Sequence, residues 1–284
     1  MPVFNAERFI KESISSVINQ IYSNWELVIV DDGSTDSSME IAASFADSRI
    51  KIYKQTNLGV ATARNHAIEK SKGEYLAFLD SDDLWDKNKL STQISLMEEN
   101  NHKFTYTSGH IVDENSYQIG ELNPTNNPFK INNASLRILV HDYISTLSVC
   151  ISKELITNKD KFIFDPFLHG TEDWDLWIRL SQLTTPAFLD IDLVSYRVVE
   201  NSLSNNFISH IVERRKVISK NHHISKKTFG LFNLAIIAHH RSFIGEYLRR
   251  REFVKLFFSA SYFFLILGLN LFQILIFYIF YNKK

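Results

Sequence analysis

The chain has 284 residues, which is room for one α/β domain of ordinary size and an appendage. Its 31 basic and 32 acidic residues leave a formal charge of −1, so the overall charge gives no reason to expect nucleic-acid binding. The single cysteine, Cys150, excludes an internal disulfide and a zinc cluster of cysteines. Its apolar neighbours indicate a small buried side chain.

The first part of the chain alternates between helical and extended patterns. Apolar residues from Ala6 to Ile21 recur on one helical face, and Asn5 stands where an N-cap is expected. We then expect a strand at 26–31, a helix at 36–46, a half-exposed strand at 50–53, a helix at 57–70 and a strand at 74–79. Alternation at this spacing is typical of βαβ units and a parallel sheet.

The second part continues the pattern with longer interruptions. We expect, in order, a helix at 86–100, a strand at 104–109, a polar loop at 115–135, a helix near 172–180, short strands at 187–189 and 194–197, and a basic helical region at 207–251. Together these elements predict an α/β fold.

Two acidic clusters each follow an apolar run. Asp31-Asp32-Gly33-Ser34 comes directly after Glu26–Val30, and Asp80-Ser81-Asp82-Asp83 comes directly after Tyr75–Leu79. Open α/β sheets bind ligands at the carboxyl ends of such strands. Carboxylates that lie close together repel and raise one another's pKa, a conflict that a divalent metal with a phosphorylated ligand resolves. The alternative is that these acids only form turns and helix caps.

A third acidic feature opens the helix near 172–180. Glu172 and Asp173 fall in its first turn, where the helix dipole favours carboxylates for purely structural reasons. That structural interpretation stays open for Glu172 above all. The apolar side chains of the same helix are expected to pack against the sheet, namely Trp174, Trp177, Ile178 and Leu180.

Seven short segments in a fixed order carry a more specific signal. They are Pro2-Val3-Phe4-Asn5, Asp31-Asp32-Gly33-Ser34-Thr35-Asp36, Asn57-Leu58-Gly59, Ala63-Arg64-Asn65, Gly73-Glu74-Tyr75, Leu79-Asp80-Ser81-Asp82-Asp83 and Glu172-Asp173-Trp174. In this order they resemble glycosyltransferase family 2, of the type that builds bacterial surface polysaccharides. The resemblance covers roughly residues 2–205. It implies the GT-A fold, a Rossmann-like, mostly parallel sheet flanked by helices, here with a C-terminal helical extension.

The resemblance also implies an activity, which is inverting transfer of a sugar from a nucleotide-diphosphate donor, usually UDP-linked, with Mn²⁺ or Mg²⁺. The nucleotide and donor site would comprise Pro2, Val3, Phe4, Glu7, Asp31, Asp32, Asn57, Arg64, Asp80 and Ser81. Within this set Asp32 resembles the residue that binds the base, and Pro2 to Phe4 the wall of the nucleotide pocket. Arg64 would lie near the diphosphate or the donor sugar.

The same resemblance assigns the chemistry to two carboxylates. Asp82 resembles the metal ligand of an Asp-X-Asp element that begins at Asp80, and Asp173 resembles the catalytic base. A sugar hydroxyl is a poor nucleophile, so a positioned carboxylate must take its proton during attack. A metal at the leaving diphosphate stabilises the charge that develops there.

Two departures and two alternatives accompany this interpretation. Val199 stands where many members carry a histidine, which weakens the case for a full metal shell, and the Gln-X-X-Arg-Trp signature of processive synthases is missing. Transfer of single sugars is therefore expected. One alternative is a transferase-like subunit that binds nucleotide without turnover. The other, a Rossmann-type oxidoreductase, lacks the Gly-X-Gly-X-X-Gly turn that it needs.

Both ends of the chain carry expectations of their own. The strand leading into Pro2 is shorter than a central strand of such a sheet, which predicts that translation starts upstream or that the chain was cut. At the other end, a basic helical extension is expected at 206–252 and an apolar, membrane-associated segment at 253–284. Residues 256–281 carry no charge and are long enough to span a bilayer as a helix.

The basic flank at 249–255 favours keeping the catalytic domain on the cytoplasmic side of the membrane, where lipid-linked or other glycan acceptors would meet it. Gly268 and Asn270 interrupt the apolar run, so a helical hairpin in one leaflet is an alternative to a single span. A third possibility is an apolar helix that covers the catalytic domain or a dimer interface.

Overall fold

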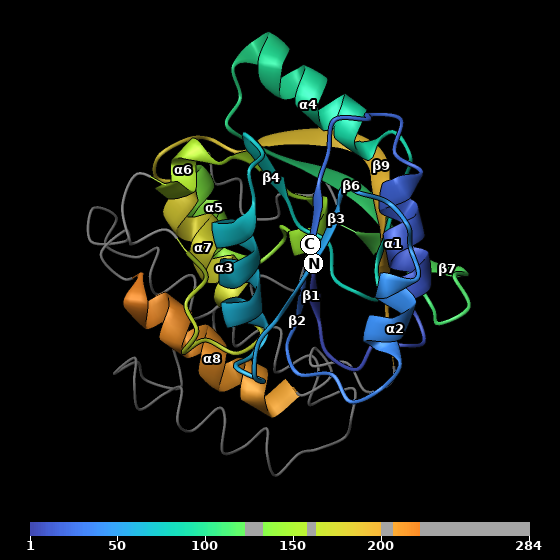
Figure 1. Ribbon diagram of the computed structural model, residues 1–284. Helices are drawn as coiled ribbons and strands as arrows, with labels where there is room; N and C mark the ends of the chain where they lie inside the picture. The colour runs from blue at the N-terminus through green and yellow to red at the C-terminus, as the bar shows by residue number, and fades with distance from the viewer. Residues whose placement is uncertain (123–132, 158–162, 200–206, 222–284) are drawn as a thin grey trace. The chain divides into compact units, whose positions relative to one another are not determined.

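The computed structural model describes residues 1–122, 133–157, 163–199 and 207–221 (Figure 1). Contacts divide the chain into two units, Met1–Asn221 and His222–Lys284, and the following description concerns the first. The predicted segment at 253–284 and most of the predicted extension at 206–252 lie outside the described residues. Among the residues that are described, no helix is both long and apolar enough to cross a membrane.

The elements follow one another in the order drawn in Figure 1. They are β1 (Pro2–Val3), α1 (Ile10–Ile18), β2 (Leu27–Asp31), α2 (Ser38–Ala43), β3 (Ile50–Lys54), α3 (Val60–Lys70), β4 (Tyr75–Ala77), β5 (Leu84–Trp85), α4 (Lys89–Asn100), β6 (Phe104–Val112), β7 (Gln118–Leu122), α5 (Ala134–Val140), η1 (Thr146–Ser148), β8 (Cys150–Ser152), α6 (Glu154–Thr157), α7 (Glu172–Leu180), β9 (Ala187–Arg197) and α8 (Phe207–Lys220).

The strands form two sheets. In the first, β1, β2 and β3 are parallel, with Val3 opposite Asp31 and Asp31 opposite Lys54. The second has the order β4-β8-β6-β9-β5, with β7 on β6. The predicted α/β fold is confirmed, but among the described strands of the second sheet only β6 and β9 pair in parallel, so the pairing there is mixed rather than mostly parallel. Strand β8 lies antiparallel between β4 and β6, and β7 and β5 add antiparallel pairs with β6 and β9.

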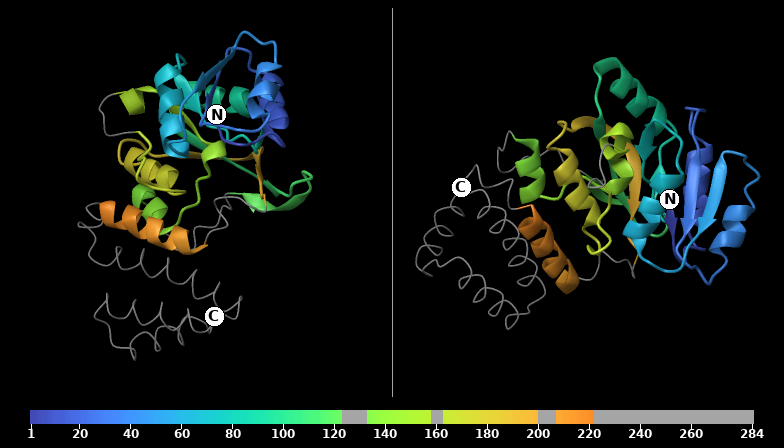
Figure 2. Two further views of the ribbon diagram at one scale, coloured as in Figure 1. Left: turned by 60° about the horizontal axis from the view of Figure 1, so that its bottom comes forward. Right: turned by 60° about the vertical axis from the view of Figure 1, so that its left-hand side comes forward.

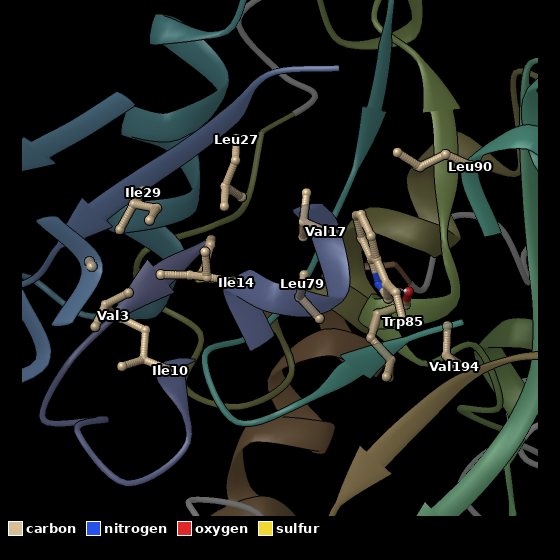
Figure 3. Packing of buried hydrophobic residues seen from close by; sticks show 13 residues of the cluster. Val3, Ile10, Ile14, Val17, Leu27, Ile29, Leu79, Trp85, Leu90 and Val194 are labelled. Carbon is tan, nitrogen blue, oxygen red and sulfur yellow. Dashed lines mark hydrogen bonds between the residues drawn. The ribbon is translucent and has the colours of Figure 1, made fainter. Parts of the chain in front are cut away.

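Strand β2 is buried on both faces, as expected for the centre of a parallel sheet. Leu27 and Ile29 belong to an apolar cluster that includes α1, through Ile10 and Ile14 (Figure 3). On the opposite face Val28 and Val30 pack with α3. Figure 1 shows the resulting layers, with α1 and α2 on one side of β1–β3 and α3 on the other.

The first helix differs from its prediction at both ends. Helix α1 begins at Ile10, and Asn5 is not its N-cap. Asn5 has a φ of 49°, and its side-chain oxygen accepts a hydrogen bond of 2.9 Å from Thr35 N, so it joins two loops. Asparagine tolerates this left-handed conformation better than most residues do. Ile21 lies beyond the helix and is exposed rather than part of the apolar face.

The predicted loop at 115–135 is wrong in two places and lies partly outside the described residues, at 123–132. Residues 118–122 form β7, a hairpin partner of β6. Residues 134–140 form α5, where the Asn133 side chain caps the helix by accepting a hydrogen bond from Leu136 N at 3.0 Å. The pattern misled because β7 pairs along only one edge and keeps polar residues exposed.

Other predictions agree with the structure. Cys150 is a free, buried thiol, and β3 is half-exposed. The two strands expected at 187–189 and 194–197 form the single long strand β9. Met1 is buried and its amino nitrogen donates to Val28 O at 2.9 Å, while the expected upstream start stays a prediction.

Candidate active site

The first acidic cluster folds the loops beside β1 and β2. Asp31 accepts a hydrogen bond of 2.8 Å from Ser34 N and so closes the turn after β2. Asp32 is buried, and both of its carboxylate oxygens accept hydrogen bonds at 2.8–2.9 Å, from Gln55 Nε2, Leu58 N and Gly59 N. The carboxylate that was predicted to bind the base therefore also fixes the loop that leads into α3.

Close packing and a positive φ both favour glycine at position 33. Its φ is 85°, and a Cβ at this position would stand 3.2 Å from the backbone nitrogen of Asn57. The turn after β2 and the loop before α3 therefore approach each other at backbone distance. Asn57 itself is exposed, as a nucleotide contact would require.

The other residues of the predicted nucleotide wall are placed unequally. Pro2 and Val3 are buried in β1, whereas Phe4 is 49% exposed at the carboxyl end of that strand. Glu7 accepts a hydrogen bond of 3.0 Å from Ser37 N, just ahead of α2. Phe4 therefore offers a ring to a ligand, while Glu7 ties the β1 loop to α2.

A buried arginine joins the second and third acidic features. Arg64, on α3 and only 6% exposed, donates through Nη2 to both oxygens of Asp80 at 2.8 and 2.9 Å. Through Nη1 it donates to Glu172 Oε1 at 2.7 Å. Burial alone would lower the pKa of Arg64, but Asp80 and Glu172 hold it above its usual value. Arg64 is thus engaged by protein carboxylates at the place where a donor contact was predicted.

Burial raises the pKa of the remaining acids of the second cluster. Burial raises the pKa of Asp82 to about 6, and the neighbouring Asp80 contributes to the rise. Burial, together with Asp82, puts the pKa of Asp83 well above its ordinary value. Asp83 Oδ1 accepts a hydrogen bond of 2.8 Å from Arg197 N, whereas its buried Oδ2 has no hydrogen-bond partner. Ser81 is half-buried, and its carbonyl accepts from Ser13 Oγ at 2.9 Å.

A divalent cation fits this cluster only together with a substrate. In the part of the chain that the structure describes, no three His, Cys, Asp or Glu side chains gather closely enough to hold a metal ion alone. Mg²⁺-type sites for phosphorylated substrates commonly use one or two carboxylates and complete their shell with phosphate oxygens and water. Asp82, half-buried and repelled by Asp80, is suited to be such a ligand.

The predicted helix at 172–180 is confirmed as α7, and its apolar residues are buried. Trp177 packs against the rings of Phe78, Phe104 and Phe164, with centroid distances of 5.5–6.0 Å. Asp173, in the first turn, is half-buried, and its Oδ2 accepts a hydrogen bond of 2.6 Å from Thr146 Oγ1. The packing of α7 therefore fixes the position of the Asp173 backbone, and the hydrogen bond from Thr146 orients its carboxylate.

Arg197 is a part of the site that the sequence argument missed. It is 1% exposed, and its Nε donates to the carbonyl of Asp82 at 2.9 Å. Its Nη2 donates to Glu12 Oε2 at 2.6 Å and its Nη1 to the carbonyl of Glu114 at 3.1 Å. The feature of the sequence that could have indicated Arg197 is its position as a lone arginine at the end of a mostly apolar strand.

Comparison with known proteins identifies the family. The profile of Glycosyl transferase family 2 matches residues 1–155. The chain belongs to this family. It is therefore a glycosyltransferase, and the oxidoreductase alternative is excluded.

Two curated relatives from bacteria agree with this assignment. The chain is 38% identical over 209 residues to the UDP-Glc:alpha-D-GlcNAc-diphosphoundecaprenol beta-1,3-glucosyltransferase WfgD of Escherichia coli, covering 72% of this chain and 78% of that protein. It is 32% identical over 209 residues to the putative teichuronic acid biosynthesis glycosyltransferase TuaG of Bacillus subtilis, covering 72% and 80%.

Solved structures confirm the GT-A fold. TarS 1-349 of S. aureus in complex with UDP-GlcNAc superposes with a TM-score of 0.64 at 22% identity, covering 77% of this chain and 64% of that one. The mannosyltransferase PcManGT of Pyrobaculum calidifontis, in complex with GDP-Man and Mn²⁺, gives 0.62 at 14% identity, covering 87% and 73%. The chain thus spans just under two thirds of the TarS fragment.

Proposed function

We propose that this glycosyltransferase moves a sugar from a UDP-linked donor to a hydroxyl of a lipid-linked glycan, with inversion at the anomeric carbon. Asp173 acts as the base and Asp82 as the metal ligand. The observation that carries the proposal is the bridge that Arg64 makes between Asp80 and Glu172. It connects the acidic turn after β4 to the residue that precedes Asp173.

The residue that would accept the proton of the acceptor hydroxyl, Asp173, lies in the first turn of α7. Asp173 receives a hydrogen bond from Thr146 and another from Trp174 N at 2.7 Å, so both of its oxygens have fixed donors. Each carboxylate oxygen keeps a lone pair for an incoming hydroxyl. Glu172, the adjacent acid, is engaged by Arg64 through a hydrogen bond of 2.7 Å. A carboxylate held in this way can accept the hydroxyl proton as the new bond forms.

The donor half is arranged by β1, β2 and β4. The exposed ring of Phe4 and the exposed Asn57 are available to the nucleotide, while Asp31 and Asp32 hold the loops that present them. Asp80 carries the donor sugar or ribose in this arrangement. A divalent ion, when bound through Asp82, supplies positive charge for the leaving diphosphate.

The acceptor class follows from the relatives and from the C-terminal sequence. WfgD is named for an undecaprenyl-diphosphate acceptor, and residues 256–281 of this chain are uncharged. We propose that this apolar stretch attaches the enzyme to the cytoplasmic face of the membrane, next to such acceptors. Surface-polysaccharide assembly is the process that this location serves.

The test is donor turnover by the purified protein. A panel of nucleotide sugars with Mn²⁺ or Mg²⁺ should reveal slow hydrolysis of one UDP-sugar, and a thermal-shift titration should show stabilisation by UDP with metal. UDP binding without hydrolysis or transfer of any donor would instead favour the second candidate, a nucleotide-binding subunit that has lost activity. The missing histidine at Val199 is the observation behind that candidate.

A further inference from the structure

Beside Asp173 lies an ion pair that the mechanism does not use. Asp142, in the loop after α5, and Arg214, on α8, are joined by a contact of 3.3 Å between Oδ2 and Nη2. Figures 1 and 2 show α8 running alongside α5 and α7. We propose that Arg214 binds a phosphate group of the acceptor. In the absence of acceptor, Arg214 is paired with Asp142 instead. The inference rests on the proposed function and adds a substrate contact to it.

Arg214 is held in a fixed orientation by an aromatic ring. Its guanidinium lies over the Trp174 ring, 5.1 Å from the centroid. The indole is itself fixed, because Trp174 Nε1 donates to Ile138 O at 2.6 Å. A guanidinium that is stacked in this way loses little freedom when its planar donors engage a phosphate. Trp174 directly follows Asp173 on α7, so the guanidinium of Arg214 stacks on the residue next to the proposed base.

The pair is accessible to a ligand. The side chains of Arg214 and Asp142 are 28% and 27% exposed. They are therefore neither free in solvent nor sealed in the core. A contact of 3.3 Å is longer than the roughly 2.7–2.9 Å typical of charged hydrogen bonds, so the internal pairing is not of the tightest kind.

The carboxylates around the pair make Arg214 the group that an anionic acceptor would need. Burial raises the pKa of Asp142 to about 6; Arg214 opposes the shift, and Asp173 and Glu172 add to it. Three carboxylates thus lie within electrostatic reach of one another next to the site where the acceptor hydroxyl must be deprotonated. An acceptor that carries phosphate would be repelled by them unless a cation met it, and Arg214 provides that cation. Bidentate recognition of phosphate is the chemistry for which arginine is best suited.

The experiment measures binding of two probes to the UDP-saturated, full-length protein by calorimetry. One probe is a short-chain alkyl diphosphate of N-acetylglucosamine, and the other is the alkyl glycoside of the same sugar without phosphate. The wild type should bind the diphosphate at least about tenfold more tightly. Arg214→Gln should weaken diphosphate binding by about 10- to 100-fold and leave glycoside binding unchanged. Arg214→Lys, which keeps the charge but loses the planar donors, should fall between the two.

Asp142→Asn should change the affinity for the diphosphate probe in the opposite direction. Because this variant removes the competing internal anion, it should bind the diphosphate probe more tightly than the wild type does. A purely structural ion pair would instead weaken binding in both variants. Arg215→Gln is the matched control, since it makes the same charge change on the next residue of α8, about 100° around the helix, and should bind like the wild type.

Several results would overturn the inference. They are equal affinity of the wild type for both probes, equal behaviour of Arg214→Gln and Arg215→Gln, weaker binding by Asp142→Asn, and binding of inorganic pyrophosphate as tight as that of the sugar diphosphate. UDP binding is measured on the same samples. Loss of UDP binding by the wild type would contradict the proposed function, whereas normal UDP binding with any of the results above would contradict this inference alone.

Discussion

Arg64 donates a 2.7 Å hydrogen bond to Glu172, a residue 108 positions further along the chain, and both side chains are buried. Two helices, α3 and α7, are thereby joined at the level of the active-site acids. A buried ion pair contributes little when it is compared with an apolar pair, but breaking it leaves an uncompensated charge. The bridge is therefore a point at which stability and activity are linked.

Replacing Arg64 by Met should destabilise the protein strongly. The buried carboxylate of Glu172 would lose its cation, at a cost of about 3–5 kcal/mol, and the partly exposed Asp80 would lose the same partner. Chemical denaturation of the variant measures this loss. Arg49→Met removes an arginine that is 37% exposed, whose ion pair is screened by solvent, so the loss of stability should be much smaller. Similar losses in the two variants would show that the Arg64 bridge contributes nothing special.

Asp173→Asn should abolish transfer while the protein still binds UDP. Loss of a positioned base typically reduces the rate by about 10²- to 10⁴-fold. Steady-state transfer and UDP calorimetry on the same sample check both halves of the expectation. Asp190→Asn, at an exposed position on β9, is the matched change and should leave both unaltered. Near wild-type turnover by Asp173→Asn would remove this residue from the role of base.

Asp82→Ala should act on binding through the metal. UDP affinity measured with Mn²⁺ should fall, while the weaker affinity measured with a chelator should stay the same, because only the metal-dependent part uses this carboxylate. Calorimetric titrations under both conditions give the two numbers. An unchanged difference between them would rule out Asp82 as the ligand.

Asp142 predicts a pH dependence of stability. Its pKa is about 6 in the folded protein, above the ordinary aspartate value of 3.8, so the folded state binds the proton more tightly than the unfolded state does. The stability of the wild type relative to Asp142→Asn should therefore be highest below about pH 4 and fall as the pH rises to about 6, by at most about 3 kcal/mol. Denaturation curves measured at intervals between these two values and above them test the sign. A relative stability that rises over this range would contradict the raised pKa.

The C-terminal stretch should decide where the enzyme is found in the cell. Full-length protein is expected in the membrane fraction and should need detergent for extraction, whereas a version ending near Arg251 should not. Fractionation of the two proteins expressed side by side provides the comparison. A full-length protein that stays soluble without detergent and behaves like the shortened one would remove the membrane from the proposal.

Local patterns were sufficient to predict most of the first half of the fold. The buried run ending at Asp31 and the alternation at β3 set their own periodicity, and each was found at the expected place. The failures have a common cause. Strand β7 pairs along one edge, and α5 is short, so each depends on its neighbours more than on its own residues.

The site was predictable in its residue types and not in its connections. Order along the sequence indicated that Arg64, Asp80 and Asp173 belong together, but not that Arg64 would be enclosed by two carboxylates. Asp32 was expected to face a ligand, and the structure shows three donors from residues 55–59 around it. Such partners are set by the close approach of loops, which no local pattern encodes.

Arg197 has a consequence for how the enzyme can diverge. Its side chain fastens the acidic turn, α1 and the turn between β6 and β7, and at the last of these it uses the backbone carbonyl of Glu114. The side chain of Glu114 forms an ion pair with Arg8, which is 58% exposed, so this pair contributes little. An insertion or deletion in the turn that moves this carbonyl would break the hydrogen bond from Arg197. The length of the hairpin turn is therefore constrained by a contact that no side chain of the turn makes.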